Sequence, residues 1–131
     1  MVNEISKGLK ILFLLQVTVS YLFGIIYFGF TEAYIDIVGW PWYDPIAGRV
    51  LGISLLTYGT CSLIAFLRKD WNTAKIVIEI QIIWHILILG VQIVGAIIFN
   101  LWGVIWFLIA IMLPFLVAFL YFYITEPKRI G

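Results

Sequence analysis

The sequence predicts an all-α, polytopic membrane protein built as an antiparallel four-helix transmembrane bundle, and three observations support this prediction. Hydrophobic residues make up 64% of the 131 residues and charged residues only 11%, whereas soluble domains average about half and a quarter. The apolar residues form four blocks of about 20, the length that a helix needs to cross a hydrocarbon layer. Short segments rich in charge, proline, glycine or asparagine separate these blocks. We therefore expect a single transmembrane domain over residues 1–131.

Each expected span is set by the ends of its apolar block. The first span covers residues 9–30, and "TEAYIDIVGWPWYDPIAG" separates it from the second span, at 49–67. The loop "RKDWNTAK" precedes the third span, at 76–99, and a turn around "NLWG" precedes the fourth, at 101–124. Pro114 lies inside the fourth span, where it removes a backbone hydrogen bond and is expected to kink the helix.

The basic residues predict the orientation of the bundle, because Lys and Arg near span ends favour the cytoplasmic side. Four spans place both termini and the "RKDWNTAK" loop on one face, which carries seven of the eight basic residues, with Arg49 alone on the other. We expect a multi-pass protein of the cell (cytoplasmic) membrane with both termini in the cytoplasm. The lipid bilayer is an expected partner, whereas a net charge of +1 gives no reason to expect nucleic acid.

Polar residues inside the first three spans predict a polar interior. A helix turns about 100° per residue, so Gln81, His85 and Gln92 share one face of the third span. The same spacing gives each of the first two spans one polar face. Lipid offers these groups no hydrogen-bond partners, so the faces are expected to meet inside the bundle. The grouped residues are Gln16, Ser20 and Tyr27 on the first span, and Ser54, Thr57, Tyr58, Cys61 and Ala65 on the second.

Depth along the helices narrows this prediction to a candidate midplane polar cluster. Ser20, Tyr58 and His85 each lie near the middle of their spans, so an antiparallel bundle in register brings them together near the centre of the bilayer. Gln16, Cys61 and Gln81 are expected to be displaced towards the cytoplasm. The candidate cluster consists of Ser20, Tyr58, His85, Gln16, Cys61, Gln81 and Gln92.

Two interpretations of this cluster are open. Ser, Thr, Gln and His commonly join membrane helices through hydrogen bonds worth about 0.6 to 2 kcal/mol each, in which case His85 is neutral and structural. Alternatively, the cluster is a binding site or part of a proton path, as an ionisable group at this depth often is.

Residue types needed for cofactors and catalysis are scarce. Cys61 is the only cysteine and His85 the only histidine, so neither a zinc site with three or four protein ligands nor haem between two histidines is expected. We predict no metal or other cofactor, and interpret Cys61 as a helix-packing residue. His85 has no carboxylate at its level to support nucleophilic catalysis, and the chain lacks a glycine-rich phosphate loop. Catalysis by this chain alone is therefore not expected.

Glu79 is the one acidic residue within the third span. It lies about 160° from Gln81 around the helix, so it is expected to point away from the candidate cluster. Lys75, four residues earlier, predicts an i,i+4 ion pair near the head groups. The alternative is contact with a basic residue of a partner protein.

The loop "GWPWYDPIAGRVLG" predicts a structured segment at the membrane surface. Its aromatic residues match the belt found at membrane interfaces, and Pro45 suits the first turn of a helix. Gly48 and Gly52 form a small-xxx-small pair that allows another helix to approach closely. The segment is interpreted either as an interfacial loop with a local salt bridge, or as an outer-loop docking surface or a lid over the outer mouth of the bundle. The candidate docking residues are Trp40, Trp42, Tyr43, Asp44 and Arg49.

The same loop resembles a known group of proteins. It reads W-P-W at residues 40–42, D-P at 44–45 and R-V-L-G at 49–52. This pattern is similar to that of small four-span prokaryotic membrane proteins of unassigned function, over about the middle third of the chain. The resemblance implies an integral membrane helix bundle and no particular activity.

Two functions are compatible with these observations. In the first, the chain is a non-catalytic accessory or structural subunit that packs against partner subunits of a larger membrane protein complex. In the second, it is a homo-oligomeric carrier or receptor that binds a small molecule near Ser20, Tyr58 and His85. The lack of a cofactor motif and of a carboxylate pair favours the first function.

Overall fold

The computed structural model describes residues 3–39 and 44–131. Within these residues the chain forms helices only, apart from one isolated β-bridge, and four of the helices are long and apolar enough to cross a membrane. The predicted all-α class and its four spans are therefore confirmed, and the chain is a multi-pass integral membrane protein. The helices are α1 (Lys7–Gly29), α2 (Thr31–Val38), α3 (Pro45–Arg68), α4 (Trp71–Phe99) and α5 (Trp102–Ile130).

Local capping chemistry sets several helix ends beyond the predicted apolar blocks. Ser6 accepts a hydrogen bond from the Leu9 N–H at the start of α1, and Asp70 does the same for Thr73 at the start of α4. Asp44 caps α3, with Pro45 in the first helical turn. Side-chain acceptors of this kind satisfy the free N–H groups of a first turn. Consequently α3 and α4 begin four and five residues before the expected positions 49 and 76.

Two further differences from the expected spans concern the ends of the bundle. The short helix α2 occupies part of the segment that was expected only as a separator. The fourth span runs as one helix through Pro114 and on to Ile130, six residues beyond the expected end at 124. Polar residues can extend a helix out of the hydrocarbon layer because water and head groups tolerate them. The kink expected at Pro114 stays a prediction.

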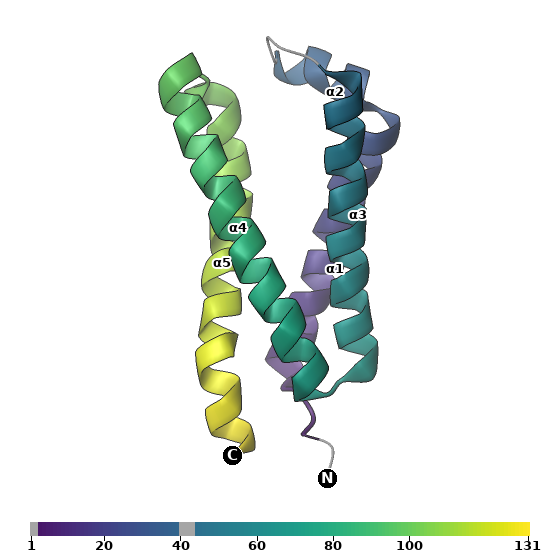
Figure 1. Ribbon diagram of the computed structural model, residues 1–131, viewed down its shortest axis with the longest axis vertical. Coiled ribbons are helices and arrows are strands. Elements are labelled where there is room, and N and C mark those ends of the chain that lie inside the picture. The colour runs from purple at the N-terminus through teal and green to yellow at the C-terminus, as the bar shows by residue number, and fades with distance from the viewer. Residues whose placement is uncertain (1–2, 40–43) are drawn as a thin grey trace.

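The long helices form two pairs that diverge from a common end. Helices α1 and α3 pack most extensively on each other, and α4 packs on α5. The pairs converge at the end that holds both chain termini, here called the terminal end, and separate towards the opposite loop end, where α2 lies (Figure 1). The fold is thus a splayed four-helix bundle.

Glycine allows the close approach of α1 and α3. A Cβ atom added at Gly52 would lie 2.6 Å from the Phe28 backbone nitrogen and 2.9 Å from the Gly24 carbonyl oxygen. A Cβ atom at Gly48 would instead meet the Thr31 side chain, at 2.6 Å. The small-xxx-small pair expected in the sequence therefore faces α1 and the start of α2.

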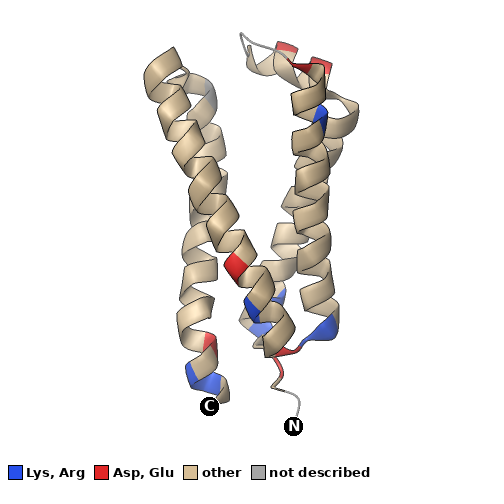
Figure 2. Ribbon diagram, in the orientation of Figure 1, with Lys and Arg blue, Asp and Glu red and all other residues tan. Residues whose placement is uncertain are grey.

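The apolar core lies at the terminal end, where all four long helices meet. Phe13 of α1 and Phe119 of α5 are fully buried there, with ring centroids 6.1 Å apart. Most of the Lys and Arg residues also lie at this end of the ribbon (Figure 2), whereas Arg49 lies near the start of α3. The core residues are Ile5, Leu9, Leu12, Phe13, Ala65, Ala74, Val77, Ile78 and Phe119.

Candidate functional site

A chain of side-chain hydrogen bonds joins three helices near the middle of the bundle. Gln81 of α4 donates through Nε2 to the Tyr58 carbonyl (3.2 Å) and to Ser62 Oγ (3.0 Å), both on α3. Gln16 of α1 donates through its own Nε2 to Gln81 Oε1 (3.4 Å) and to Ser20 Oγ (3.0 Å). Gln16 and Gln81 are 3% and 0% exposed. Buried polar groups of this kind hold helices in register when their partners are present.

The Tyr58 backbone carbonyl fixes the orientation of the side-chain amides of Gln81 and Gln16. A carbonyl oxygen can only accept, so the Tyr58 carbonyl requires Gln81 Nε2, and Gln81 Oε1 must then face Gln16. The Gln16 Nε2 group therefore occupies the side of the amide that faces Gln81. Its oxygen, Gln16 Oε1, is buried and has no hydrogen-bond partner among the described residues.

His85 lies one turn further along α4 from Gln81, in a ring of aromatic side chains. Its Nδ1 atom is 2.7 Å from the Gln81 carbonyl oxygen. Because that oxygen only accepts, neutral His85 carries its proton on Nδ1 and offers Nε2 as an acceptor. The imidazole centroid lies 5.1 to 6.2 Å from the ring centroids of Trp84, Phe115 and Phe119. The side chain is 1% exposed, so its tautomer and orientation are both constrained.

A cavity of about 360 Å³ lies between the two helix pairs, on the loop-end side of this network. All five helices contribute to its wall, which is mainly apolar and extends from Gln16, in the middle of α1, to Asp44, at the start of α3. None of the described residues that line it is Lys or Arg. The polar and histidine side chains in the wall are Gln16, Ser20, Tyr27, Thr31, Tyr34, Asp44, His85 and Gln92.

The structure brings together only part of the predicted midplane cluster. Four of its members, Gln16, Ser20, His85 and Gln92, line the cavity. Gln81 is buried beside it and holds the network together. Tyr58 contributes its backbone carbonyl, while its ring packs 4.9 Å from that of Trp84. Cys61 packs against the apolar core instead of lining the cavity.

The side-chain amide of Gln92 has only one weak hydrogen-bond partner among the described residues. Its Nε2 atom lies 3.6 Å from the Met112 sulfur, a poor acceptor. Its Oε1 atom is buried without a hydrogen-bond partner among the described residues. Two residues of the cavity wall, Gln16 and Gln92, therefore each hold a buried amide oxygen without a hydrogen-bond partner among the described residues.

The buried face of α3 differs from the predicted polar arc. The hydroxyl groups of Ser54 and Thr57 each donate to a carbonyl of their own helix at 2.9 Å, which removes the need for an interior partner. Small residues face α1 instead, and Ser62 joins the hydrogen-bond network. Ser62 was not expected in the cluster, although its spacing from the glycines marks the same face. The buried residues of α3 are Gly52, Leu55, Gly59, Ser62 and Ala65.

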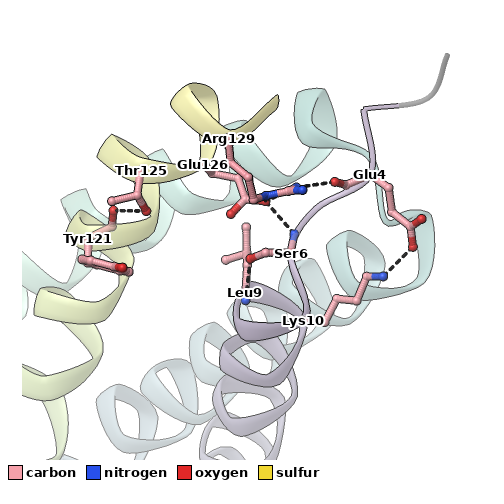
Figure 3. Close-up of polar contacts among 8 residues, drawn as sticks. All are labelled: Glu4, Ser6, Leu9, Lys10, Tyr121, Thr125, Glu126 and Arg129. Atoms are coloured by element: carbon pink, nitrogen blue, oxygen red, sulfur yellow. Dashed lines mark hydrogen bonds and ion pairs between the residues drawn. The ribbon is translucent and has the colours of Figure 1, made fainter. Parts of the chain in front are cut away.

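A second buried polar group, which the sequence does not predict, lies at the terminal end. Glu126 is 2% exposed, and its Oε1 accepts hydrogen bonds from the Ser6 N–H (2.5 Å) and from Arg129 Nη2 (2.6 Å). Arg129 Nη2 also donates to the Glu4 carbonyl (2.5 Å; Figure 3). We call Glu4, Ser6, Glu126 and Arg129 the terminal clasp. It was missed because the expected fourth span ended at 124.

The N-terminal segment inside the clasp also pairs with the loop between α3 and α4. The Ile5 N–H donates to the Lys69 carbonyl (2.9 Å), and the Trp71 N–H donates to the Asn3 carbonyl (3.0 Å). A hydrogen bond from Lys10 lowers the pKa of the Glu4 carboxyl group. The Thr73 backbone N–H likewise lowers the pKa of Asp70. These contacts fasten the start of α1 to α4 and α5 where the helix pairs converge.

Glu79 occupies the position that the sequence predicts. Its Oε1 lies 3.9 Å from Lys75 Nζ, which confirms the i,i+4 ion pair. It also accepts a hydrogen bond from the Tyr123 hydroxyl of α5, at 3.0 Å. Glu79 is not among the residues that line the cavity.

The candidate docking residues are only partly described. Trp40, Trp42 and Tyr43 lie outside the described residues. Asp44 accepts hydrogen bonds from the backbone N–H groups of residues 46 and 47, at 2.8 and 3.1 Å. Arg49 pairs with Glu32 of α2 at 3.0 Å. This ion pair links α2 to the start of α3.

The described residues contain no group of three or more His, Cys, Asp or Glu side chains that could hold a metal ion. Comparison of the chain with protein-family models, with curated proteins and with solved structures found no match. The resemblance to small four-span prokaryotic membrane proteins thus stays a prediction, and the site itself is the basis for assigning a function.

Proposed function

We propose that this protein binds a small, largely apolar molecule within the membrane, in the cavity between its two helix pairs. The observation that supports the proposal is the cavity itself, because it combines a mainly apolar wall with a few buried polar groups. Ligand sites typically have this composition and volumes of about 300 to 1,000 Å³. At about 360 Å³, the cavity suits one small ligand.

The arrangement of the helices supports this proposal. The pairs are joined at the terminal end by the apolar core and the terminal clasp, and near the middle of the bundle by the Gln16–Gln81 hydrogen bond. Towards the loop end they diverge, and the cavity occupies the space between them. Because the helices pack closely at the terminal end and diverge at the loop end, a ligand can enter between the pairs without disrupting the core.

The proposed orientation places the terminal end in the cytoplasm. Seven of the eight basic residues lie near the ends of the four long helices that meet at the terminal end, and basic residues favour the cytoplasmic face. The cavity then lies in the half of the membrane that is farther from the cytoplasm. Cysteine variants at Lys128 and Ile37, labelled with a membrane-impermeant maleimide in intact cells, test this orientation. Labelling at residue 128 in intact cells would contradict it.

A second candidate function is an accessory subunit of a membrane protein complex. A second, nearly all-apolar groove runs along α4 and α5 near the loop end and includes Gly90 and Gly95. A Cβ atom added at Gly90 would meet nothing within 4 Å. Such a groove favours close packing by a helix of a partner subunit.

Ligand-induced stabilisation tests the binding proposal. A ligand that binds only the native state at 100 times its Kd stabilises that state by about 2.7 kcal/mol. The purified protein is therefore screened in mild detergent against a panel of lipophilic compounds, with the unfolding temperature as readout. At least one compound is expected to raise this temperature in a saturable manner.

Matched tryptophan variants locate the response. Ile88→Trp fills the cavity, because Ile88 lines its wall. Ile83→Trp makes the same change on the same helix at a side chain that is 59% exposed. The stabilisation should disappear in the first variant and persist in the second. Equal responses in the two variants would contradict binding in this cavity.

A further inference from the structure

We propose that the ligand of this cavity is uncharged and presents a hydroxyl group, as a lipophilic alcohol or phenol does. This inference rests on the proposed binding function. It follows from the polar atoms that the cavity wall leaves without partners, and from the charged groups that the wall lacks.

Gln16 Oε1 is the first of these atoms. The Gln16 side chain is 3% exposed, lines the cavity and has its amide orientation fixed through Gln81 and the Tyr58 carbonyl. No described residue donates a hydrogen bond to its oxygen. A buried acceptor is costly to leave unpaired, so an occupant that donates a hydrogen bond here is favoured over one that cannot.

Ser20 supplies the complementary group, one helical turn away. Its Oγ accepts from Gln16 Nε2 at 3.0 Å, and no described residue accepts its own hydroxyl hydrogen. A ligand hydroxyl can donate to Gln16 Oε1 and accept from Ser20 at the same time. An ether or a ketone can only accept, so it would leave the Gln16 oxygen unpaired.

The remaining polar atoms also favour a donor. Gln92 Oε1 is a second buried acceptor without a partner among the described residues. Neutral His85, whose Nδ1 donates to the Gln81 carbonyl, has Nε2 as a further acceptor. Around them lie the aromatic side chains of Trp84 and Phe115. A compact molecule with an aromatic or aliphatic body and a hydroxyl group matches these surroundings.

The residues that line the cavity disfavour a charged ligand. The described lining residues include no Lys or Arg to neutralise an anion. Asp44 is their only carboxylate, and it lies at the loop end, where it caps the first turn of α3. A cation beside Gln16 would therefore lack a counter-ion at membrane depth, which is energetically unfavourable.

Three matched probes test the inference: 2-naphthol, its methyl ether 2-methoxynaphthalene, and the cation 2-naphthylmethylammonium. Their equilibrium binding to the protein in lipid nanodiscs is measured, with partitioning into empty nanodiscs subtracted. We expect saturable binding of 2-naphthol with a Kd at least about tenfold lower than that of either other probe. Ile88→Trp should abolish this binding.

Variants at the polar pair connect the preference to the proposed contacts. Gln16→Met removes the acceptor at similar size, and Ser20→Ala removes only the hydroxyl group, which keeps the test valid if the first variant does not fold. Each should reduce the preference for 2-naphthol over its ether to less than about threefold. The control Thr18→Ala should retain it, because Thr18 is exposed and bonds only to the Leu14 carbonyl of its own helix.

Each outcome separates the inference from the proposed function. If the ether or the cation binds as tightly as 2-naphthol and Ile88→Trp abolishes that binding, the hydroxyl inference is overturned while the binding function stands. If Gln16→Met and Ser20→Ala both keep the full preference, the assigned contacts are wrong. If no probe binds saturably, the hydroxyl inference is overturned, and the compound panel with Ile88→Trp and Ile83→Trp decides the binding function separately.

Discussion

Substitution of Gly52 by alanine is predicted to destabilise the protein by forcing α1 and α3 apart. The new Cβ atom would lie 2.6 Å from the Phe28 nitrogen, about 0.8 Å short of the 3.4 Å at which ordinary contact begins. The Gly24 carbonyl oxygen, at 2.9 Å, blocks a second direction. Backbone atoms cannot rotate out of the way as a flexible side chain can, so the two helices must move.

The expected loss of stability follows from this displacement. A gap of 0.5 to 1 Å removes about a quarter to a half of the dispersion attraction between facing atoms, and overpacking typically costs about 1 to 3 kcal/mol. Alanine regains up to about 1 kcal/mol through its higher helix propensity. Because backbone is met on two sides, we expect a net destabilisation of about 1 to 2 kcal/mol for Gly52→Ala.

Gly90→Ala is the matched control, since a Cβ atom at that position meets nothing within 4 Å. It should be neutral or stabilise the protein by up to about 1 kcal/mol. Reversible unfolding in mixed micelles of increasing SDS content, followed by tryptophan fluorescence, gives the free energy of unfolding of both variants. Equal stability of Gly52→Ala and the parent would refute the packing of α1 on α3 described above.

Two further predictions concern the terminal end. Glu126→Gln removes the charged acceptor of the Ser6 N–H and Arg129 and should lower the free energy of unfolding by about 1 to 3 kcal/mol; a change below about 0.5 kcal/mol would show that the terminal clasp contributes little. The pKa of Asp70 is lowered in the folded state, so its ionised form stabilises that state. This stabilisation is fully present above the unfolded-state pKa of about 3.9. It is lost as the pH falls through the lower folded-state pKa. Asp70→Asn retains a good N-cap but should lack this component, so the stability difference between parent and variant should change below about pH 4 and stay constant from pH 5 to 7.

The membrane spans and two polar faces could be predicted because lipid penalises specific patterns. Uninterrupted apolar blocks define the spans, and a polar group such as Gln16 or Gln81 must find a partner inside the bundle. Both residues do lie in the interior, and they bond to each other. The periodicity of a few polar residues is thus informative even when every other position is apolar.

Hydrophobicity carries less information about α3. Its lipid-facing and protein-facing sides are both apolar, and Thr57 satisfies its hydroxyl group within its own helix. The buried face is instead set by small residues such as Gly52 and Gly59, which permit close helix contact. A polar arc was therefore a poor guide to the orientation of this helix.

The terminal clasp and the divergence of the helix pairs depend on contacts between distant parts of the chain. Glu126 meets Ser6 across 120 positions of sequence, and no local pattern indicates that pairing. Similarly, the apolar blocks are compatible with parallel or splayed helices. The cavity follows from this long-range geometry, so it was beyond the reach of composition and spacing.

Native mass spectrometry of the chain, released from its own membranes in mild detergent, tests the central claim most directly. Binding in the cavity predicts masses at 15.0 kDa or its multiples, each carrying a non-covalent small molecule that collisional activation releases. That adduct should be absent from Ile88→Trp and present on Ile83→Trp. Unrelated polypeptides in fixed stoichiometry, with no small-molecule adduct, would contradict the claim and assign the chain to a membrane complex as an accessory subunit.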